Sequence, residues 1–355
     1  MPACARRALA GCRAGSQSSR RRGRRSAIRL VGGWPVRHRL AVRRVAALDC
    51  GTNSLRLLVA DLDMARGEAV EVDRRTTIVR LGQGVDRTGA FAPEALARTF
   101  ATLDDYAAAI GRHGVRADAV RVVATSAVRD VSNRAAFVSG VAARIGVAPD
   151  VISGDEEAAL AYDGATRGLV GRSDLASPLV VVDIGGGSTE VVTRRVAKGG
   201  QVAGVAGQSL DVGSVRVTER YLHSDPPSGG EVAAVTAAVD NALDALDARL
   251  TSAGTLVGVA GTITTVAAMA LGLSTYDRQR IHHAWIDTSA LLAATDRLVA
   301  MPVARRKELG FMHPGRADVI GGGALILQAV VRRLGVPGLL VSEHDILDGI
   351  AWTVA

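Results

Sequence analysis

Residues 180–192 read V-V-V-D-I-G-G-G-S-T-E-V-V, with three consecutive glycines inside a run of β-branched residues. The β-branched residues on either side predict two strands, and the glycines between them predict a tight turn. Strand interiors avoid glycine, because it has no side chain to pack and loses the most entropy on ordering. The three glycines at 185–187 therefore indicate a turn that has no room for side chains.

The same pattern occurs earlier in the chain. Asp49-x-Gly51-x-x-Ser54 matches Asp183-x-Gly185-x-x-Ser188, and position 49 lies 134 positions before position 183. A period of that length is too long for a solenoid repeat. It predicts two related domains, each of which opens with the same glycine-turn hairpin.

Helix and strand patterns alternate around these hairpins. We expect strands at 45–48, 55–62, 120–124, 151–152, 256–259 and 339–341, and helices at 94–110, 133–145, 155–167, 231–250, from 261 onward, within 317–334 and at 346–354. This alternation predicts the α/β class. A length of 355 residues also favours two domains.

The net charge of +8 is positive only because of the first 44 residues, which hold 13 of the 43 basic residues and no acid. The remaining 30 basic residues face 35 acidic ones, which leaves a charge of −5. Residues 1–44 could bind nucleic acid or act as a targeting segment. We favour a disordered arm or a misassigned start codon, because blocks of like charge are usually unstructured.

The three cysteines, Cys4, Cys12 and Cys50, form no paired framework and no metal-binding spacing. This pattern fits a reducing, cytoplasmic setting. No apolar run reaches the length of a transmembrane helix, so we expect no membrane partner.

The two glycine turns are candidate phosphate sites. Such turns direct several backbone N–H groups into one concavity, which suits anionic oxygens. Asp49 and Asp183 would repel phosphate unless a divalent cation such as Mg²⁺ bridged the two. The alternative is an ordinary tight hairpin, but two aligned copies favour a pair of turns that clamps a chain of phosphates across a cleft.

These residues resemble the actin-like ATPase superfamily, and in detail the exopolyphosphatase and guanosine pentaphosphate phosphohydrolase family. Five motifs carry the resemblance, in order: A-A-L-D-C-G-T-N-S, A-T-S-A-V-R-D, I-S-G-D-E-E-A, V-V-D-I-G-G-G-S-T-E and G-V-A-G-T-I-T-T. The resemblance implies two actin-like, ribonuclease H-like domains at 45–170 and 171–355, with a phosphate-binding cleft between them and a last helix that packs back on the first domain.

Glu157 is the candidate that positions and activates the attacking water. Ser153 and Glu156 have the spacing of a capping box, which leaves Glu157 without a structural task. The residues alone are equally consistent with a solvated helix carboxylate. The resemblance to the family favours the catalytic role.

Arg129 follows the strand expected at 120–124 and is the second catalytic candidate. Its guanidinium can bind phosphate in a bidentate manner and neutralise charge in the transition state. The alternative is a surface ion pair with Asp130. An arginine stands at this place in the family, which favours the functional role.

The remaining site residues are implied by the resemblance and by the turn chemistry. Mg²⁺ or Mn²⁺ would be held by Asp183, Glu190 and Asp49. Phosphate oxygens would be bound by residues of the two turns: Gly51, Thr52, Asn53, Ser54, Gly185, Gly186, Gly187 and Ser188.

The expected reaction is hydrolysis of the terminal phosphoanhydride of inorganic polyphosphate, with release of orthophosphate. The chain resembles the short two-domain members of the family, which favours short polymers. The alternatives are a guanosine pentaphosphate phosphohydrolase, a non-catalytic sensor of guanosine penta- or tetraphosphate, and an actin-fold sugar or acid kinase. A homodimer is also expected as an assembly, and nucleic acid only through residues 1–44.

Overall fold

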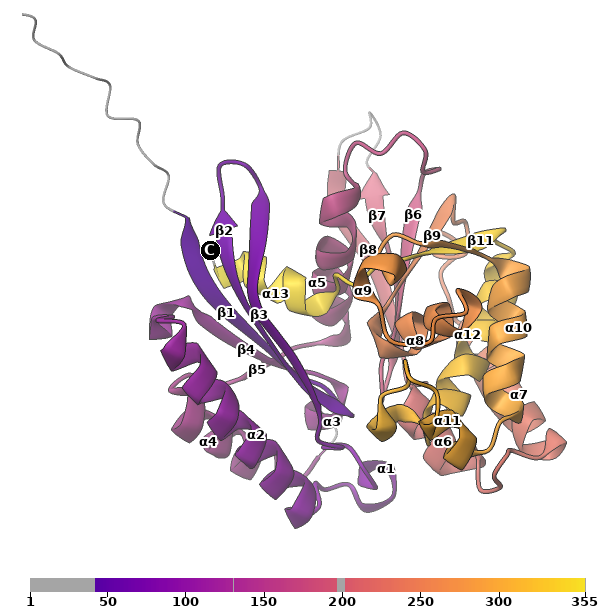
Figure 1. Ribbon diagram of the computed structural model, residues 1–355, viewed down its shortest axis with the longest axis horizontal. Coiled ribbons are helices and arrows are strands. Elements are labelled where there is room, and N and C mark those ends of the chain that lie inside the picture. The colour runs from indigo at the N-terminus through magenta and orange to yellow at the C-terminus, as the bar shows by residue number, and fades with distance from the viewer. Residues whose placement is uncertain (1–41, 130, 197–201, 355) are drawn as a thin grey trace, which may run out of the picture. The chain divides into compact units, whose positions relative to one another are not determined.

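Two β-sheets with matching strand order organise the protein (Figure 1). The computed structural model describes residues 42–129, 131–196 and 202–354, all of which belong to one compact unit, Leu40–Ala355. The first sheet has the order β3-β2-β1-β4-β5, and the second has the order β10-β11-β9-β6-β7-β8. Without the edge strand β10, both sheets consist of an antiparallel meander of three strands joined to two parallel strands. The predicted α/β class with two related domains is confirmed.

The strands are β1 Arg43–Cys50, β2 Ser54–Asp63, β3 Glu68–Ile78, β4 Val120–Ala124, β5 Asp150–Val151, β6 Leu179–Ile184, β7 Thr189–Val196, β8 Val202–Leu210, β9 Thr255–Val259, β10 Trp285–Asp287 and β11 Gly338–Val341. The third strand of each meander, β3 and β8, was not predicted. Both lie at sheet edges: β3 is rich in charged residues, and β8 holds two glycines and two alanines, which make a weak strand pattern. Edge strands lack the continuous apolar pattern that marks a buried strand.

The α-helices are α1 Val85–Thr88, α2 Pro93–Arg112, α3 Ser126–Arg129, α4 Arg134–Ile145, α5 Gly154–Thr166, α6 Ser214–Tyr221, α7 Gly229–Asp244, α8 Ala260–Ala270, α9 Arg278–Ile281, α10 Thr288–Ala300, α11 Val303–Lys307, α12 Ile320–Leu334 and α13 Ile346–Val354. Three 3₁₀ turns add η1 Ala117–Ala119, η2 Arg167–Leu169 and η3 Pro314–Arg316.

Helix α7 is shorter than the 231–250 expected from the sequence, because polar side chains compete for its last turn. Gln208 Nε2 donates to the carbonyl of Ala245 at 3.0 Å, and Asp247 accepts from the backbone N–H of Arg249 at 2.8 Å. Such local side-chain bonds offer the backbone an alternative to helix.

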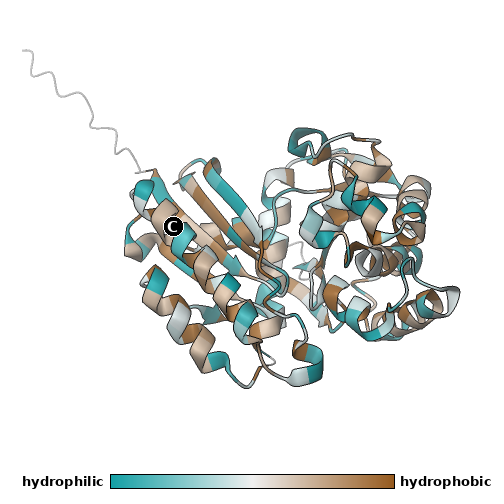
Figure 2. Cartoon of the chain, turned by 60° about the horizontal axis from the view of Figure 1, so that its bottom comes forward, coloured by the Kyte–Doolittle hydropathy of each residue, from teal (hydrophilic) through white to brown (hydrophobic). Residues whose placement is uncertain are grey.

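Helices α5 and α13 pack against each other between the two sheets. One face of the first sheet packs on α2 and α4, whereas Val45 and Ala47 on the other face pack with Leu160 of α5 and Ile350 of α13. Helix α5 also packs on β6, β7 and β8 of the second sheet. Brown and teal segments alternate along the helices in Figure 2, as amphipathic helices require.

The first strand begins earlier than the predicted arm boundary at residue 44. Arg43 and Arg44 belong to β1, and Arg44 Nε donates to Asp61 Oδ1 at 2.7 Å. The pairing with Asp61 supplies the acidic partner that a disordered arm would lack. The rest of the predicted arm, residues 1–41, lies outside the described residues.

Among the helices of the described ranges, none combines the length and the apolar character needed to cross a bilayer.

Candidate active site

The two glycine turns have the same backbone geometry. Gly51 N–H donates to the carbonyl of Ser54 at 3.0 Å, and Gly185 N–H donates to the carbonyl of Ser188 at 3.0 Å. Each turn closes a hairpin, β1–β2 in the first sheet and β6–β7 in the second. The repeated motif in the sequence is therefore a repeated structure.

The glycines of the second turn are required by close packing across the cleft. A Cβ atom on Gly187 would lie 2.6 Å from Ser126 Oγ and 2.7 Å from Thr52 Oγ1, which belong to the first half of the chain. A Cβ atom on Gly186 would lie 3.1 Å from Thr52 Cβ. None of the three glycines has a positive φ. The turn thus needs glycine for contact with the opposite turn.

We expect Gly187→Ala to lower kcat/KM by about 10- to 10²-fold, since the added methyl group forces the two turns apart and small displacements at a reacting centre are costly. The measurement is phosphate release from a polyphosphate substrate. Gly111→Ala is the matched control, because a Cβ atom there meets nothing within 4 Å and should leave the rate unchanged. Equal rates for Gly187→Ala and wild type would show that the contact between the turns is dispensable.

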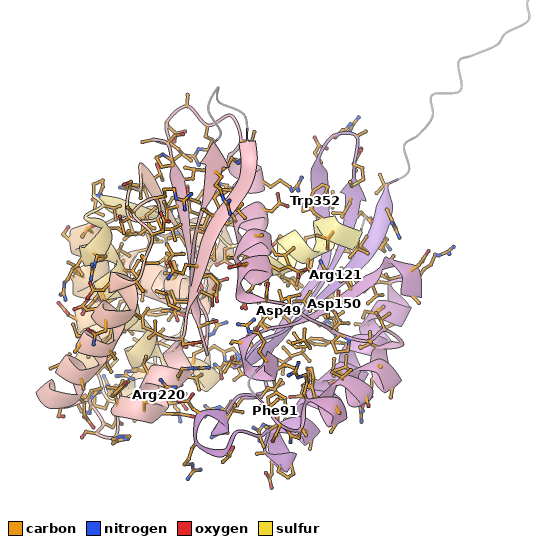
Figure 3. All side chains as sticks on the ribbon, turned by 180° about the vertical axis from the view of Figure 1, so that it is seen from behind. Asp49, Phe91, Arg121, Asp150, Arg220 and Trp352 are labelled. Atoms are coloured by element: carbon orange, nitrogen blue, oxygen red, sulfur yellow. The ribbon has the colours of Figure 1, made fainter. Side chains whose placement is uncertain are left out.

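One cavity lies between the two turns and collects most of the predicted residues. Seven of the eight predicted phosphate-binding residues line it, together with Asp49, Glu157 and Asp183: Gly51, Thr52, Asn53, Ser54, Gly185, Gly186 and Ser188. Gly187, Arg129 and Glu190 lie outside its lining. Figure 3 shows Asp49 at the end of β1 nearest to the second sheet.

The two halves of the site differ in charge at equivalent positions. Asp49 is the cross-strand partner of Arg56, whereas Asp183 is the cross-strand partner of Glu190. Arg56 Nη2 lies 2.6 Å from Asp49 Oδ2, so one oxygen of the first acid has a cationic partner. The second acid faces another acid. Burial, with further repulsion from Glu157 and Asp183, raises the pKa of Glu190 well above its usual range.

Glu157 projects from α5 toward the cavity and is 8% exposed. Its Oε2 accepts from Arg129 Nη1 at 2.9 Å, and the same nitrogen donates to the carbonyl of Ile152 at 3.0 Å. Burial raises the pKa of Glu157 to about 7, and the Arg129 bond opposes this shift. Arg129 therefore orients the candidate base. Asp130, its alternative partner in the sequence reading, lies outside the described residues.

Glu156 does not complete the predicted capping box. Ser153 Oγ accepts from the Glu156 N–H at 3.2 Å as expected, but the Glu156 carboxylate accepts from Arg121 Nη2 at 2.8 Å. A charge-assisted bond to a guanidinium is stronger than one to a backbone N–H. Arg121 also bonds Asp150 at 2.9 Å, and the two are labelled side by side in Figure 3.

The sequence analysis did not identify Arg56, Arg316 or Asp345. Arg56 lines the cavity and pairs with Asp345 as well as with Asp49. The guanidinium of Arg316 has no hydrogen bond or ion pair in the part of the chain that the structure describes, and it lies against the first turn of α8. A Cβ atom on Gly261 would come within 2.4 Å of Arg316 Cζ. An unpaired cation beside a helix N-terminus is suited to an anion.

A second, larger cavity continues from the first. It measures about 560 Å³, and the two cavities share Arg56, Ala260, Gly261 and Arg316 in their walls. Arg74 and Arg278 line it as ion pairs with acids that include Glu71 and Glu343, and Tyr276 and Phe311 add aromatic surface. The site therefore has room for a ligand that extends beyond one phosphate.

A divalent cation fits the first cavity. Asp49 Oδ1 is buried without a hydrogen-bond partner, and Asp183 opens onto the same space. Burial raises the pKa of Asp183 to about 8, with repulsion from Asp345 adding to the shift. Within the described ranges no group of three or more His, Cys, Asp or Glu side chains could hold a metal alone. Mg²⁺ commonly takes one or two carboxylates and completes its shell with substrate phosphates and water, so Asp49 and Asp183 suit it.

The model of the Ppx/GppA phosphatase family matches residues 62–351. This chain belongs to the Ppx/GppA phosphatase family.

Relatives of the family support this placement over nearly the whole chain. Exopolyphosphatase 2 of Mycobacterium tuberculosis is 49% identical over 329 residues, which cover 89% of this chain and 100% of the relative. A crystal structure of an exopolyphosphatase-like protein matches with a TM-score of 0.82 at 40% identity, over 88% of this chain and 97% of that one.

A second solved Ppx/GppA structure is more distant. The Aquifex aeolicus family member has a TM-score of 0.70 at 29% identity and covers 87% of this chain and 96% of its own. The predicted resemblance to the exopolyphosphatase and guanosine pentaphosphate phosphohydrolase family is thus confirmed.

Proposed function

We propose that this Ppx/GppA protein is an exopolyphosphatase, which hydrolyses the terminal phosphoanhydride of inorganic polyphosphate and releases orthophosphate. The observation that carries the proposal is the position of Glu157, in one cavity with both glycine turns. The N–H groups of the turns and the hydroxyls of Thr52, Ser54 and Ser188 would bind the terminal phosphate from two sides.

Glu157 would act as the base in this reaction. Its carboxylate accepts a proton from the attacking water while the water oxygen bonds to phosphorus and the bridging P–O bond breaks. Arg129 holds the carboxylate in place through the 2.9 Å hydrogen bond. Mg²⁺ or Mn²⁺ bound at Asp49 and Asp183 would neutralise the phosphate charge.

The rest of the polymer would occupy the second cavity. Arg56 and Arg316 lie in the shared wall, so a phosphate chain that leaves the first cavity would meet the guanidinium of Arg316, which has no carboxylate partner among the described residues. The limited size of this space favours short polymers. The aromatic side chains of Tyr276 and Phe311 there also favour guanosine pentaphosphate as a second candidate substrate.

Phosphate release from four substrates tests the function: short polyphosphate, long polyphosphate, guanosine pentaphosphate and ATP. We expect the highest kcat/KM with short polyphosphate. Release only from guanosine pentaphosphate would replace the proposal with its alternative, and transfer from ATP to a sugar or acid would indicate a kinase. No release from any polyphosphate would refute it. A cytoplasmic location and a homodimer stay predictions.

A further inference from the structure

Three polar side chains form a row across the second sheet. Asp183 on β6 is the direct cross-strand partner of Glu190 on β7, which in turn is the direct partner of Ser209 on β8. Directly opposed residues of neighbouring strands point to the same face of a sheet. The row therefore leads from the edge strand β8 to Asp183 on the cavity wall.

This row faces the helix that carries the candidate base. Val181 and Val192 pack with Ala158 of α5, and the two-residue period of a strand places Asp183 and Glu190 on that same face. Ser209 reaches the helix itself, since a Cβ atom on Gly154 would lie 2.6 Å from Ser209 Cβ. Ser209 thus contacts the first turn of α5, three residues before Glu157.

Glu190 depends on hydrogen bonds because it is 1% exposed. Ser209 Oγ donates to Glu190 Oε1 at 2.7 Å. A buried carboxylate that loses a donor must rotate toward another partner or draw the surrounding structure with it. The hydrogen bond from Ser209 fixes the direction in which Glu190 points behind the cavity.

We propose that Ser209 is a positioning residue for the hydrolysis: its hydroxyl holds the Glu190 carboxylate in the row beside Asp183, and its contact with Gly154 holds the start of α5 so that Glu157 keeps its place. The proposal rests on the proposed function. Ser209 touches neither substrate nor the reacting atoms, and it acts through Glu190 and α5.

The first test compares Ser209→Ala and Ser209→Cys with wild type on short polyphosphate. Alanine removes the donor, and cysteine keeps the shape but donates weakly. We expect both to lower kcat by about 10-fold with KM unchanged, the size of effect seen for residues that orient a functional group from behind. A kcat within two-fold of wild type for Ser209→Ala would overturn the proposal.

Thr193→Val is the matched control. Thr193 is a buried hydroxyl on the same sheet, and its Oγ1 donates to the carbonyl of Leu179 at 2.7 Å, outside the row. We expect this variant to lower Tm at least as much as Ser209→Ala and to keep the wild-type kcat. An equal loss of kcat in Thr193→Val would show that general destabilisation explains the result.

A double-variant comparison tests whether Ser209 acts through Glu190. Single-turnover phosphate release with excess enzyme is measured for Glu190→Gln alone and for Glu190→Gln with Ser209→Ala. If Ser209 acts through the Glu190 carboxylate, the double variant is no slower than Glu190→Gln. Alanine keeps the Cβ atom that contacts Gly154, so a further 10-fold loss would contradict the route through Glu190. If wild type itself releases no phosphate from polyphosphate, the proposed function fails instead.

Discussion

Replacing Glu157 by glutamine is expected to lower kcat by about 10²–10⁴ and to leave KM nearly unchanged, which is the usual contribution of a positioned general base. Glutamine has the same shape and can still accept the hydrogen bond that Arg129 Nη1 donates at 2.9 Å. The variant therefore removes the proton acceptor without moving its neighbours. Steady-state phosphate release and a melting curve check both parts of the expectation.

Glu156→Gln is the matched control for this variant. Glu156 lies one position earlier on α5, but its side chain is 46% exposed and pairs with Arg121 at 2.8 Å. We expect a nearly wild-type rate, since an exposed ion pair contributes little and the helix cap by Ser153 remains. If Glu156→Gln abolished turnover while Glu157→Gln did not, the roles of the two carboxylates would be reversed.

The pH dependence provides an independent check on Glu157. Burial raises the pKa of this carboxyl to about 7, and only the deprotonated form can accept a proton. The wild-type rate should therefore fall as the pH drops through about 7, and Glu157→Gln should lack this limb. The stability change has a defined sign: a raised pKa stabilises the fold at low pH, and this stabilisation is lost as the pH rises through about 7. Glu157→Gln should thus melt at the wild-type Tm or higher at pH 8.

Removing divalent cations is expected to lower phosphate release by about 10² or more, because a cation contributes several kcal/mol of transition-state stabilisation. Asp49 and Asp183 line the cavity that would receive the phosphates, and Asp49 Oδ1 has no hydrogen-bond partner. Without a cation, like charges would face each other at close range. Excess EDTA should abolish turnover, and added Mg²⁺ or Mn²⁺ should restore it.

The melting temperature separates a catalytic cation from a structural one. Asp49 and Asp183 offer two carboxylates, which leave most of the Mg²⁺ coordination shell to phosphate and water, so EDTA should leave Tm unchanged. Mg²⁺ should bind tightly only in the presence of a phosphate chain, which calorimetry can measure. Full turnover in excess EDTA would contradict the clamp formed by the two turns and a cation.

The local parts of the site could be predicted from the sequence because their geometry is set by neighbours in the chain. The turn hydrogen bonds from Gly51 to Ser54 and from Gly185 to Ser188 follow from the spacing of each motif. The same register placed Arg56 opposite Asp49, so a closer reading of the first hairpin could have identified Arg56.

The remote parts could not be predicted, because they depend on how distant segments pack. Asp345 meets Arg56 only because β11 leads into a helix that crosses to the first sheet. Arg316 reaches the cavity through a 3₁₀ turn beside α8, and no periodic pattern marks it. Ser209 lies on an edge strand that was not predicted, so its bond to Glu190 had no basis in the sequence pattern.

The crossing of α13 to the first sheet has a consequence for how the protein is made. Ile346, Leu347, Ile350 and Ala351 cover a face of that sheet whose first strand begins at Arg43. These helix residues follow that strand by about 300 positions, so the ribosome makes the strand long before the helix that covers it. The part of the apolar face that α13 covers therefore stays exposed to solvent until α13 has been made.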